Sequence, residues 1–189
     1  MKKYLDTDVR RSPRLSDYDY SKTGYYFVTF NTQNRICFFG DVVNHGMILD
    51  QAGEMIEKWW RKIAEKFSFV SLDEFIIMPN HLHGILQLQE QNDCSDRLSS
   101  LPDIIGWIKT MTTNEYIRNV DNLNWPSFDQ KLWQRSFYDR IIRNEGELKR
   151  IREYIKNNSF NWINDIENLE FRKFVSKIHL KDPYQELFD

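Results

Sequence analysis

The segment that organises this chain reads Met78-Pro79-Asn80-His81-Leu82-His83-Gly84-Ile85 and continues an apolar run that begins at residue 75. In an extended strand, successive side chains point to opposite faces of the sheet, so His81 and His83 share one face. Two imidazoles on one face can hold a single metal ion, each through one ring nitrogen. Pro79 has no amide hydrogen for a sheet ladder and predicts a corner between two strands. On this spacing alone, a metal site and a pair of ordinary polar strand residues are about equally well supported.

Composition limits the class of protein. The chain has 189 residues, a net charge of −2 and 15% aromatic residues, which suits one domain with a substantial core. The chain has no global excess of basic charge, so any binding of nucleic acid must depend on local patches. Cys37 and Cys94 lack the spacing of a zinc site or a disulfide framework. No signal peptide and no apolar run of roughly 18 residues is found, which predicts a cytoplasmic protein without a membrane partner.

The hydrophobic patterns predict the order strand, helix, strand, strand, helix, strand, helix. We expect strands at residues 25–30, 72–78, 82–88 and 137–142, and a short hairpin between residues 36–39 and 47–49. The predicted N-caps of the three helices are Asp50, Ser100 and Asn144. This order predicts an α+β fold, the ferredoxin-like split β-α-β arrangement of an antiparallel sheet with its helices on one side and an additional C-terminal helix. Within it, the histidine strand would lie near the middle of the sheet.

Three regions follow from this pattern. Residues 1–24 form a basic N-terminal arm that contains Arg10-Arg11-Ser12-Pro13-Arg14, residues 25–159 form the main domain, and residues 160–189 form a C-terminal extension. A short helix is predicted near residues 171–178. Eight Lys or Arg and four Asp or Glu between residues 131 and 156 give that stretch a net charge of +4.

The predicted helix after Asn144 carries a second polar pair. Tyr154 and Asn158 are four residues apart, so they lie on one side of the helix. They flank an apolar stripe formed by Leu148, Ile151 and Ile155, and from there they can face the sheet while the stripe anchors the helix. Taken alone, a tyrosine in this position is more often part of the core edge than of a site.

Taken together, these motifs resemble a known family. Met78-Pro79-Asn80-His81-Leu82-His83-Gly84 is followed by Leu132-Trp133-Gln134-Arg135-Ser136-Phe137 and then by Tyr154-Ile155-Lys156-Asn157-Asn158. In this order they resemble the HUH-type single-tyrosine transposases of insertion sequences, specifically the branch of REP-associated tyrosine transposases. The resemblance covers about residues 10–162. Two positions depart from the branch, since Arg140 and Ser159 stand where relatives often have histidine and proline.

The resemblance implies a function and a set of site residues. It implies that His81, His83 and Asn158 bind a divalent cation, Mg²⁺ or Mn²⁺, and that Tyr154 is the catalytic nucleophile. The enzyme would then be a metal-dependent endonuclease and strand transferase for single-stranded, hairpin or palindromic DNA, with a 5′-phosphotyrosine intermediate. The chemistry is consistent with these residue types, because a hard cation neutralises charge on a phosphoryl group and a phenolate is both a nucleophile and a leaving group.

Several questions stay open at this point. Arg11, Arg14, Arg135 and Arg143 are candidates for DNA phosphate contacts. The alternatives to a transposase are a hairpin-binding protein of the same fold that does not cut, and an unrelated His-x-His metal hydrolase. The sequence does not distinguish a monomer from a homodimer, and it does not identify the DNA target.

Overall fold

The computed structural model describes residues 18–91, 99–165 and 167–175, and its centre is a four-stranded antiparallel sheet in the order β4-β5-β1-β6. The strands are β1 (Gly24–Asn31), β4 (Val70–Met78), β5 (His81–Leu88) and β6 (Tyr138–Ile142). This strand order is that of the ferredoxin-like fold, so the predicted α+β class is confirmed. As predicted, β5 is an interior strand, hydrogen-bonded to β4 on one side and to β1 on the other.

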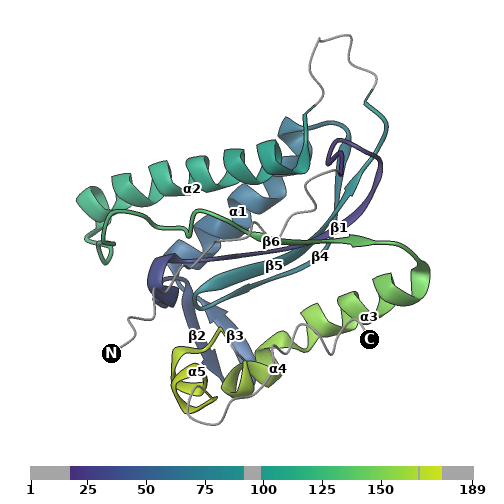
Figure 1. Cartoon of the computed structure of the whole chain (residues 1–189). Helices are drawn as coiled ribbons and strands as arrows, with labels where there is room; N and C mark the ends of the chain where they lie inside the picture. The colour runs from purple at the N-terminus through teal and green to yellow at the C-terminus, as the bar shows by residue number, and fades with distance from the viewer. Residues whose placement is uncertain (1–17, 92–98, 166, 176–189) are drawn as a thin grey trace, which may run out of the picture.

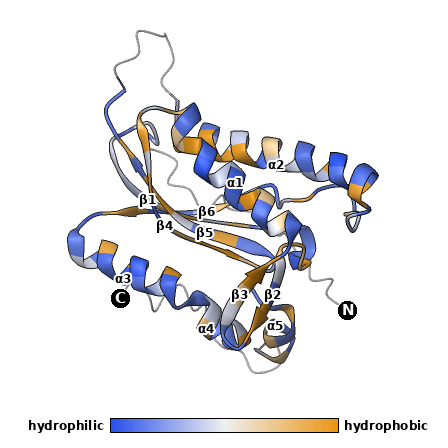
Figure 2. Cartoon of the chain, turned by 180° about the vertical axis from the view of Figure 1, so that it is seen from behind, coloured by the Kyte–Doolittle hydropathy of each residue, from blue (hydrophilic) through white to orange (hydrophobic). Residues whose placement is uncertain are grey.

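The two helices of the predicted β-α-β arrangement lie on one face of this sheet, as expected, and the additional C-terminal helix lies on the other face. Figure 1 shows α1 (Gln51–Lys66) and α2 (Leu101–Leu123) on one face and α3 (Glu145–Lys156) on the other. All three helices are amphipathic, as the alternation of hydropathy along them shows (Figure 2). Each face of the sheet offers an apolar surface, and the stripe of α3 covers the face that α1 and α2 leave open.

The two-stranded hairpin lies slightly later in the chain than predicted. It consists of β2 (Gly40–Val43) and β3 (Gly46–Leu49), and residues 36–39 precede it without forming a strand. The amides of Phe38 and Phe39 instead donate to the carbonyl of Pro79, at 2.9 and 3.1 Å, which ties this segment to the corner between β4 and β5. The corner itself falls at Pro79, as predicted.

The helix caps follow the sequence signals. Asp50 accepts a hydrogen bond from the amide of Gly53, and Asn144 accepts one from the amide of Glu147. Ser100 and Asp103 form the predicted capping box of α2. Short elements complete the described chain: η1 (Gln33–Arg35), α4 (Asn158–Asn161), η2 (Trp162–Asn164) and α5 (Leu169–Val175). The end of the helix predicted at residues 171–178 lies outside the described residues.

Helix α1 approaches the back of the histidine strand unusually closely. Trp60 of α1 is fully buried and packs over Gly84, where a Cβ atom would lie 2.3 Å from the indole ring. The side-chain position of Gly84 faces away from His83. Because Gly84 has no side chain, Trp60 packs directly against the backbone of the strand that carries the histidines. Trp60 therefore has a packing role between α1 and the sheet.

Within the ranges that the structure describes, no helix combines the length and the apolar character needed to cross a membrane. Residues 1–17 of the predicted basic arm, with Arg11 and Arg14, fall outside the described residues.

Candidate active site

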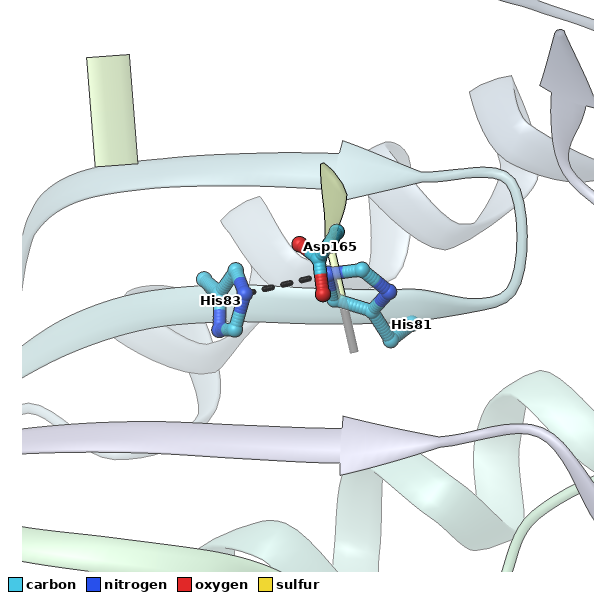
Figure 3. A group of neighbouring side chains, drawn as sticks. All are labelled: His81, His83 and Asp165. Atoms are coloured by element: carbon cyan, nitrogen blue, oxygen red, sulfur yellow. Dashed lines mark hydrogen bonds between the residues drawn. The ribbon is translucent and has the colours of Figure 1, made fainter. Parts of the chain in front are cut away.

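The pleat of β5 places His81 and His83 on the face that α3 covers. His81 lies opposite Asn31 and His83 opposite Thr29 of β1, and both imidazoles are fully buried. Their Nε2 atoms are 3.0 Å apart (Figure 3). Two ring nitrogens this close need a shared proton or a cation beside them, because two bare lone pairs repel each other.

Hydrogen bonds on the far side of each ring orient the two imidazoles. Nδ1 of His81 lies 2.8 Å from Oδ1 of Asn80. The Asn80 amide nitrogen donates to the carbonyls of Arg35 and Glu167, so its Oδ1 is the atom that accepts from Nδ1–H of His81. That tautomer leaves Nε2 of His81 with a lone pair directed into the site, as a metal ligand requires. Nδ1 of His83 makes the equivalent contact with Oγ1 of Thr29, at 2.6 Å.

Burial keeps both imidazoles neutral. Desolvation lowers the pKa of His81, and desolvation together with the neighbouring His81 lowers the pKa of His83 well below its usual value. A neutral imidazole binds a cation without first releasing a proton. The pair is therefore suited to metal binding near neutral pH.

Helix α3 brings the tyrosine to this pair. Its apolar stripe packs on the sheet against Phe27, Ile85 and Ile142, and Arg152 forms two hydrogen bonds to the Asp73 carboxylate, at 2.8 and 2.6 Å. The hydroxyl of Tyr154 lies 3.2 Å from Nε2 of His83 in the same chain. The side of α3 that carries Tyr154 thus faces the histidines, as the i, i+4 spacing predicted. The role of Tyr154 as nucleophile stays a prediction.

Asn158 completes this wall of the site from the start of α4. Its side chain is buried, and its Oδ1 has no hydrogen-bond partner. Burial lowers the pKa of His81 and raises that of Asp165, and hydrogen bonding with the Asn158 amide offsets a small part of each effect. A buried carbonyl oxygen without a donor is costly unless something else binds it, and a cation would do so.

The structure adds Asp165, which sequence reasoning did not select. One ligand atom each from His81, His83 and Asp165 lie within 4.8 Å of one another, and Figure 3 shows the carboxylate beside the two rings. Burial raises the pKa of Asp165. The sequence carried no local signal for this contact, because Asp165 lies in an irregular segment of the C-terminal extension, 82 residues beyond His83 in the numbering.

Glu167 holds that segment against the sheet. Its buried carboxylate accepts hydrogen bonds from Nδ2 of Asn31 and from Nε of Arg35, and its carbonyl accepts from Asn80. The amide of Glu167 donates to Oδ1 of Asp165, which fixes the aspartate toward the site. The extension after residue 159 therefore contributes to the same site as the main domain.

These donors fit a divalent cation. They are two neutral imidazole nitrogens, one carboxylate and one orphaned amide oxygen. Oxygen ligands favour Mg²⁺ or Mn²⁺, whereas imidazoles also accept zinc, so this set does not by itself choose the ion.

Ion pairs partly neutralise the predicted basic stretch, and two of them use acids from elsewhere in the chain. Three of its cations form ion pairs, Arg140 with Glu147, Arg152 with Asp73 and Lys156 with Glu74. Asp73 and Glu74 belong to β4, so the count over residues 131–156 could not include them. Arg135 and Arg143 have exposed side chains and stay candidates for DNA contacts.

Comparisons with known proteins agree with this geometry. A family model described as "Transposase IS200 like" matches residues 43–158. A Haemophilus influenzae protein without an assigned function is 36% identical over 165 residues, covering 82% of this chain and 91% of its own. A second protein of that organism, named as a REP-associated tyrosine transposase, is 25% identical over 147 residues, covering 75% of this chain and 74% of its own.

A solved structure shares the fold. It is a REP-associated tyrosine transposase bound to a REP hairpin, and it aligns with a TM-score of 0.53 at 19% sequence identity, covering 88% of this chain and 89% of that one.

Proposed function

Because this chain belongs to the IS200-like transposase family, we propose that it cuts and rejoins single-stranded DNA through Tyr154 with the help of a divalent cation. The observation that carries this proposal is the 3.2 Å contact between the Tyr154 hydroxyl and Nε2 of His83, inside a buried set of metal-binding donors. A tyrosine that only stabilised the core would not need to place its oxygen against a neutral histidine pair.

The chemical step that we propose is a transesterification. The Tyr154 oxygen attacks a DNA phosphorus, the bond from phosphorus to the 3′-oxygen breaks, and the products are a 5′-phosphotyrosine and a free 3′-hydroxyl. The phenol releases one proton and the departing 3′-oxygen takes one up, so the step is balanced and needs no nucleotide cofactor. The phosphodiester energy is kept in the tyrosine ester, which allows a 3′-hydroxyl to reverse the step.

The chain's own residues would hold the cation and position the tyrosine. His81, His83 and Asp165 would bind the ion together with Oδ1 of Asn158, while Thr29 and Asn80 orient the two imidazoles. When bound, Mg²⁺ or Mn²⁺ would neutralise the charge that develops on the phosphoryl oxygens. The apolar stripe of α3 and the Arg152–Asp73 ion pair would keep the Tyr154 hydroxyl at attacking distance.

Hairpin DNA is the substrate that we propose, since a solved relative of the same fold is bound to a REP hairpin. Exposed cations at Arg135 and Arg143 would contact its phosphates. Because Tyr154 meets the histidine pair of its own chain, we propose that one chain supplies a complete site whether the protein acts as a monomer or a homodimer.

The test is a cleavage assay with end-labelled hairpin DNA that carries single-stranded arms. With Mg²⁺ or Mn²⁺, we expect a band of covalent protein–DNA adduct on a denaturing gel, and none with a chelator. Binding without any adduct would identify a hairpin-binding protein that does not cut. Cleavage without a protein-linked product would identify a metal hydrolase and exclude the tyrosine mechanism.

A further inference from the structure

A polar pocket of about 520 Å³ lies just beyond the end of β1. Gln33 and Asn34 of η1 form one wall, and the segment at residues 129–136 forms the other. Neither the histidine pair nor Tyr154 lines this pocket, so its residues have no part in the chemistry proposed above.

The lining of this pocket has the groups that recognise the edge of a nucleobase. Four carboxamides line it, from Gln33, Asn34, Gln130 and Gln134. Nε2 of Gln33 donates to Oδ1 of Asn34 and Nε2 of Gln134 donates to the carbonyl of Thr32, and the remaining hydrogen-bonding capacity of these amides provides donors beside acceptors. The pattern complements the adjacent donors and acceptors on a base edge. No aromatic side chain is among the lining residues, so recognition would depend on hydrogen bonds and not on stacking.

Charged side chains restrict the ligand further. The carboxylate of Asp129 only accepts hydrogen bonds, so it favours a base with an exocyclic amino group, which thymine lacks. Lys131 and Arg135 line the same pocket and supply positive charge for a phosphate next to that base. An amino-bearing base attached to a phosphodiester matches this combination.

The walls of the pocket are held in place by the fold. The amide of Gln33 donates to the carbonyl of Leu132, and the amide of Gln134 donates to the carbonyl of Asn31, at 2.8 and 2.9 Å. The Lys109 ammonium of α2 donates to the carbonyls of Gln134 and Ser136 in this wall. A preformed pocket loses little conformational freedom when a ligand binds.

The location connects this pocket to the active site. Asn31 pairs with His81 across the sheet, and Gln33 follows Asn31 by two residues. Arg35, at the end of the same short helix, donates to Glu167, which in turn holds Asp165. A DNA strand with one phosphate at Tyr154 could therefore place a neighbouring unpaired base in the pocket.

We propose that this pocket is a specificity subsite that reads one unpaired, amino-bearing base of the DNA strand near the cleaved phosphate. The inference rests on the proposed function and adds a residue-level account of its target choice. Gln33 and Asp129 read the base edge, and Lys131 and Arg135 bind the adjoining phosphate.

The test uses the full chain and a pool of hairpins whose single-stranded arms are randomised, with sequencing of the bound fraction. We expect wild-type protein to enrich adenine, cytosine or guanine and to exclude thymine at one arm position. Gln33→Ala and Asp129→Asn should each reduce the preference at that position about tenfold, while preferences elsewhere and adduct formation persist. Asn122→Ala, which changes an exposed carboxamide on α2, serves as the matched control.

The outcomes separate this inference from the proposed function. Wild-type binding and adduct formation with unchanged base preferences in both variants would overturn the pocket alone, provided that the variants melt like the wild type. Loss of all hairpin binding in the wild type would overturn the function and the pocket together. Competition by free deoxynucleoside monophosphates as strong as that by DNA would make this a nucleotide site and also overturn the inference.

Discussion

At the residue scale, the site depends on a few atoms whose positions are fixed by hydrogen bonds to neighbouring residues. Each imidazole is fixed by a hydrogen bond on Nδ1 that directs Nε2 toward Tyr154 and Asp165. Removing single atoms from this group should therefore separate chemistry from stability.

Tyr154→Phe removes one oxygen and almost no packing. We expect the melting temperature and the affinity for hairpin DNA to change little, whereas the covalent adduct disappears. Tyr116→Phe is the matched control, because its hydroxyl donates to the carbonyl of Pro126 on the α2 side of the molecule. That variant should lose about 1 kcal/mol of stability and keep the adduct. An adduct formed by Tyr154→Phe would mean that the nucleophile lies elsewhere.

Asp165→Asn tests the ligand that only the structure revealed. The change keeps the shape of the side chain and removes the charge that attracts a cation, so the affinity for Mn²⁺ in a calorimetric titration should fall at least about tenfold. Asp41→Asn, on the exposed side of β2, should leave it unchanged. Equal Mn²⁺ affinities for the two variants would remove Asp165 from the metal site.

The depressed pKa values of the histidine pair predict a pH dependence of stability in metal-free protein. In the unfolded chain these histidines take up protons below about pH 6.5, whereas burial keeps them neutral in the folded state to a lower pH. Below about pH 6.5 the unfolded state therefore binds more protons than the folded state. The free energy of unfolding consequently decreases as the pH falls through this range. Urea midpoints measured from about pH 8 to about pH 5.5 should drop less for a His81→Gln, His83→Gln double variant. Parallel curves would contradict this origin.

At the element scale, the histidine strand is held between helices on its two faces. Helix α1 presses on it through Trp60 and Gly84, and α3 covers the opposite face with its apolar stripe and its ion pairs to β4. The geometry of the site consequently depends on close packing behind it as well as on the residues that line it.

Gly84→Ala tests that support. The added methyl group would lie 2.3 Å from the Trp60 ring, so the strand or the helix must shift, at a cost of about 1–3 kcal/mol in urea unfolding. Combining it with Trp60→Phe should cost less than the sum of the two single changes. Gly106→Ala is the control, because a Cβ there meets nothing within 4 Å and should stabilise α2 by about 0.5–1 kcal/mol. If the free-energy changes of the two single variants simply add in the double variant, the contact between Gly84 and Trp60 does not limit the packing.

At the scale of the whole molecule, DNA binding has to come from local charge. The net charge is −2, and three cations of the basic stretch are already paired with acids. The exposed Arg135 lines the polar pocket and the exposed Arg143 lies just before α3, and both remain candidates for phosphate contacts. An acidic protein can still bind DNA when such cations share one side of the molecule.

We expect hairpins with single-stranded arms to bind more tightly than a blunt duplex of the same sequence. Affinity should fall steeply between about 50 and about 200 mM salt, and Arg135→Gln and Arg143→Gln should each reduce the slope of log affinity against log salt by about one. Arg61→Gln on α1 is the control, since Arg61 pairs with Glu57 on the other face of the sheet. An unchanged slope in the first two variants would remove them from the interface.

The sequence by itself determined the features that depend on neighbouring residues. The alternation around His81 and His83, the i, i+4 spacing of Tyr154 and Asn158, and the cap residues follow from the periodicities of strands and helices, and the structure confirms the elements that they predicted. The order of those elements then sufficed for the ferredoxin-like sheet, because few connections are possible between them.

Only the tertiary structure decided which distant groups meet. It placed α3 on the face of the sheet opposite α1 and α2, and it paired Arg152 and Lys156 of α3 with Asp73 and Glu74. It also brought Asp165 close to the histidine pair and Glu167 into contact with Asn31. Finally, it assembled the polar pocket from two segments about 100 residues apart. Such contacts depend on how whole surfaces pack and on where buried polar groups find partners, and no local periodicity encodes either.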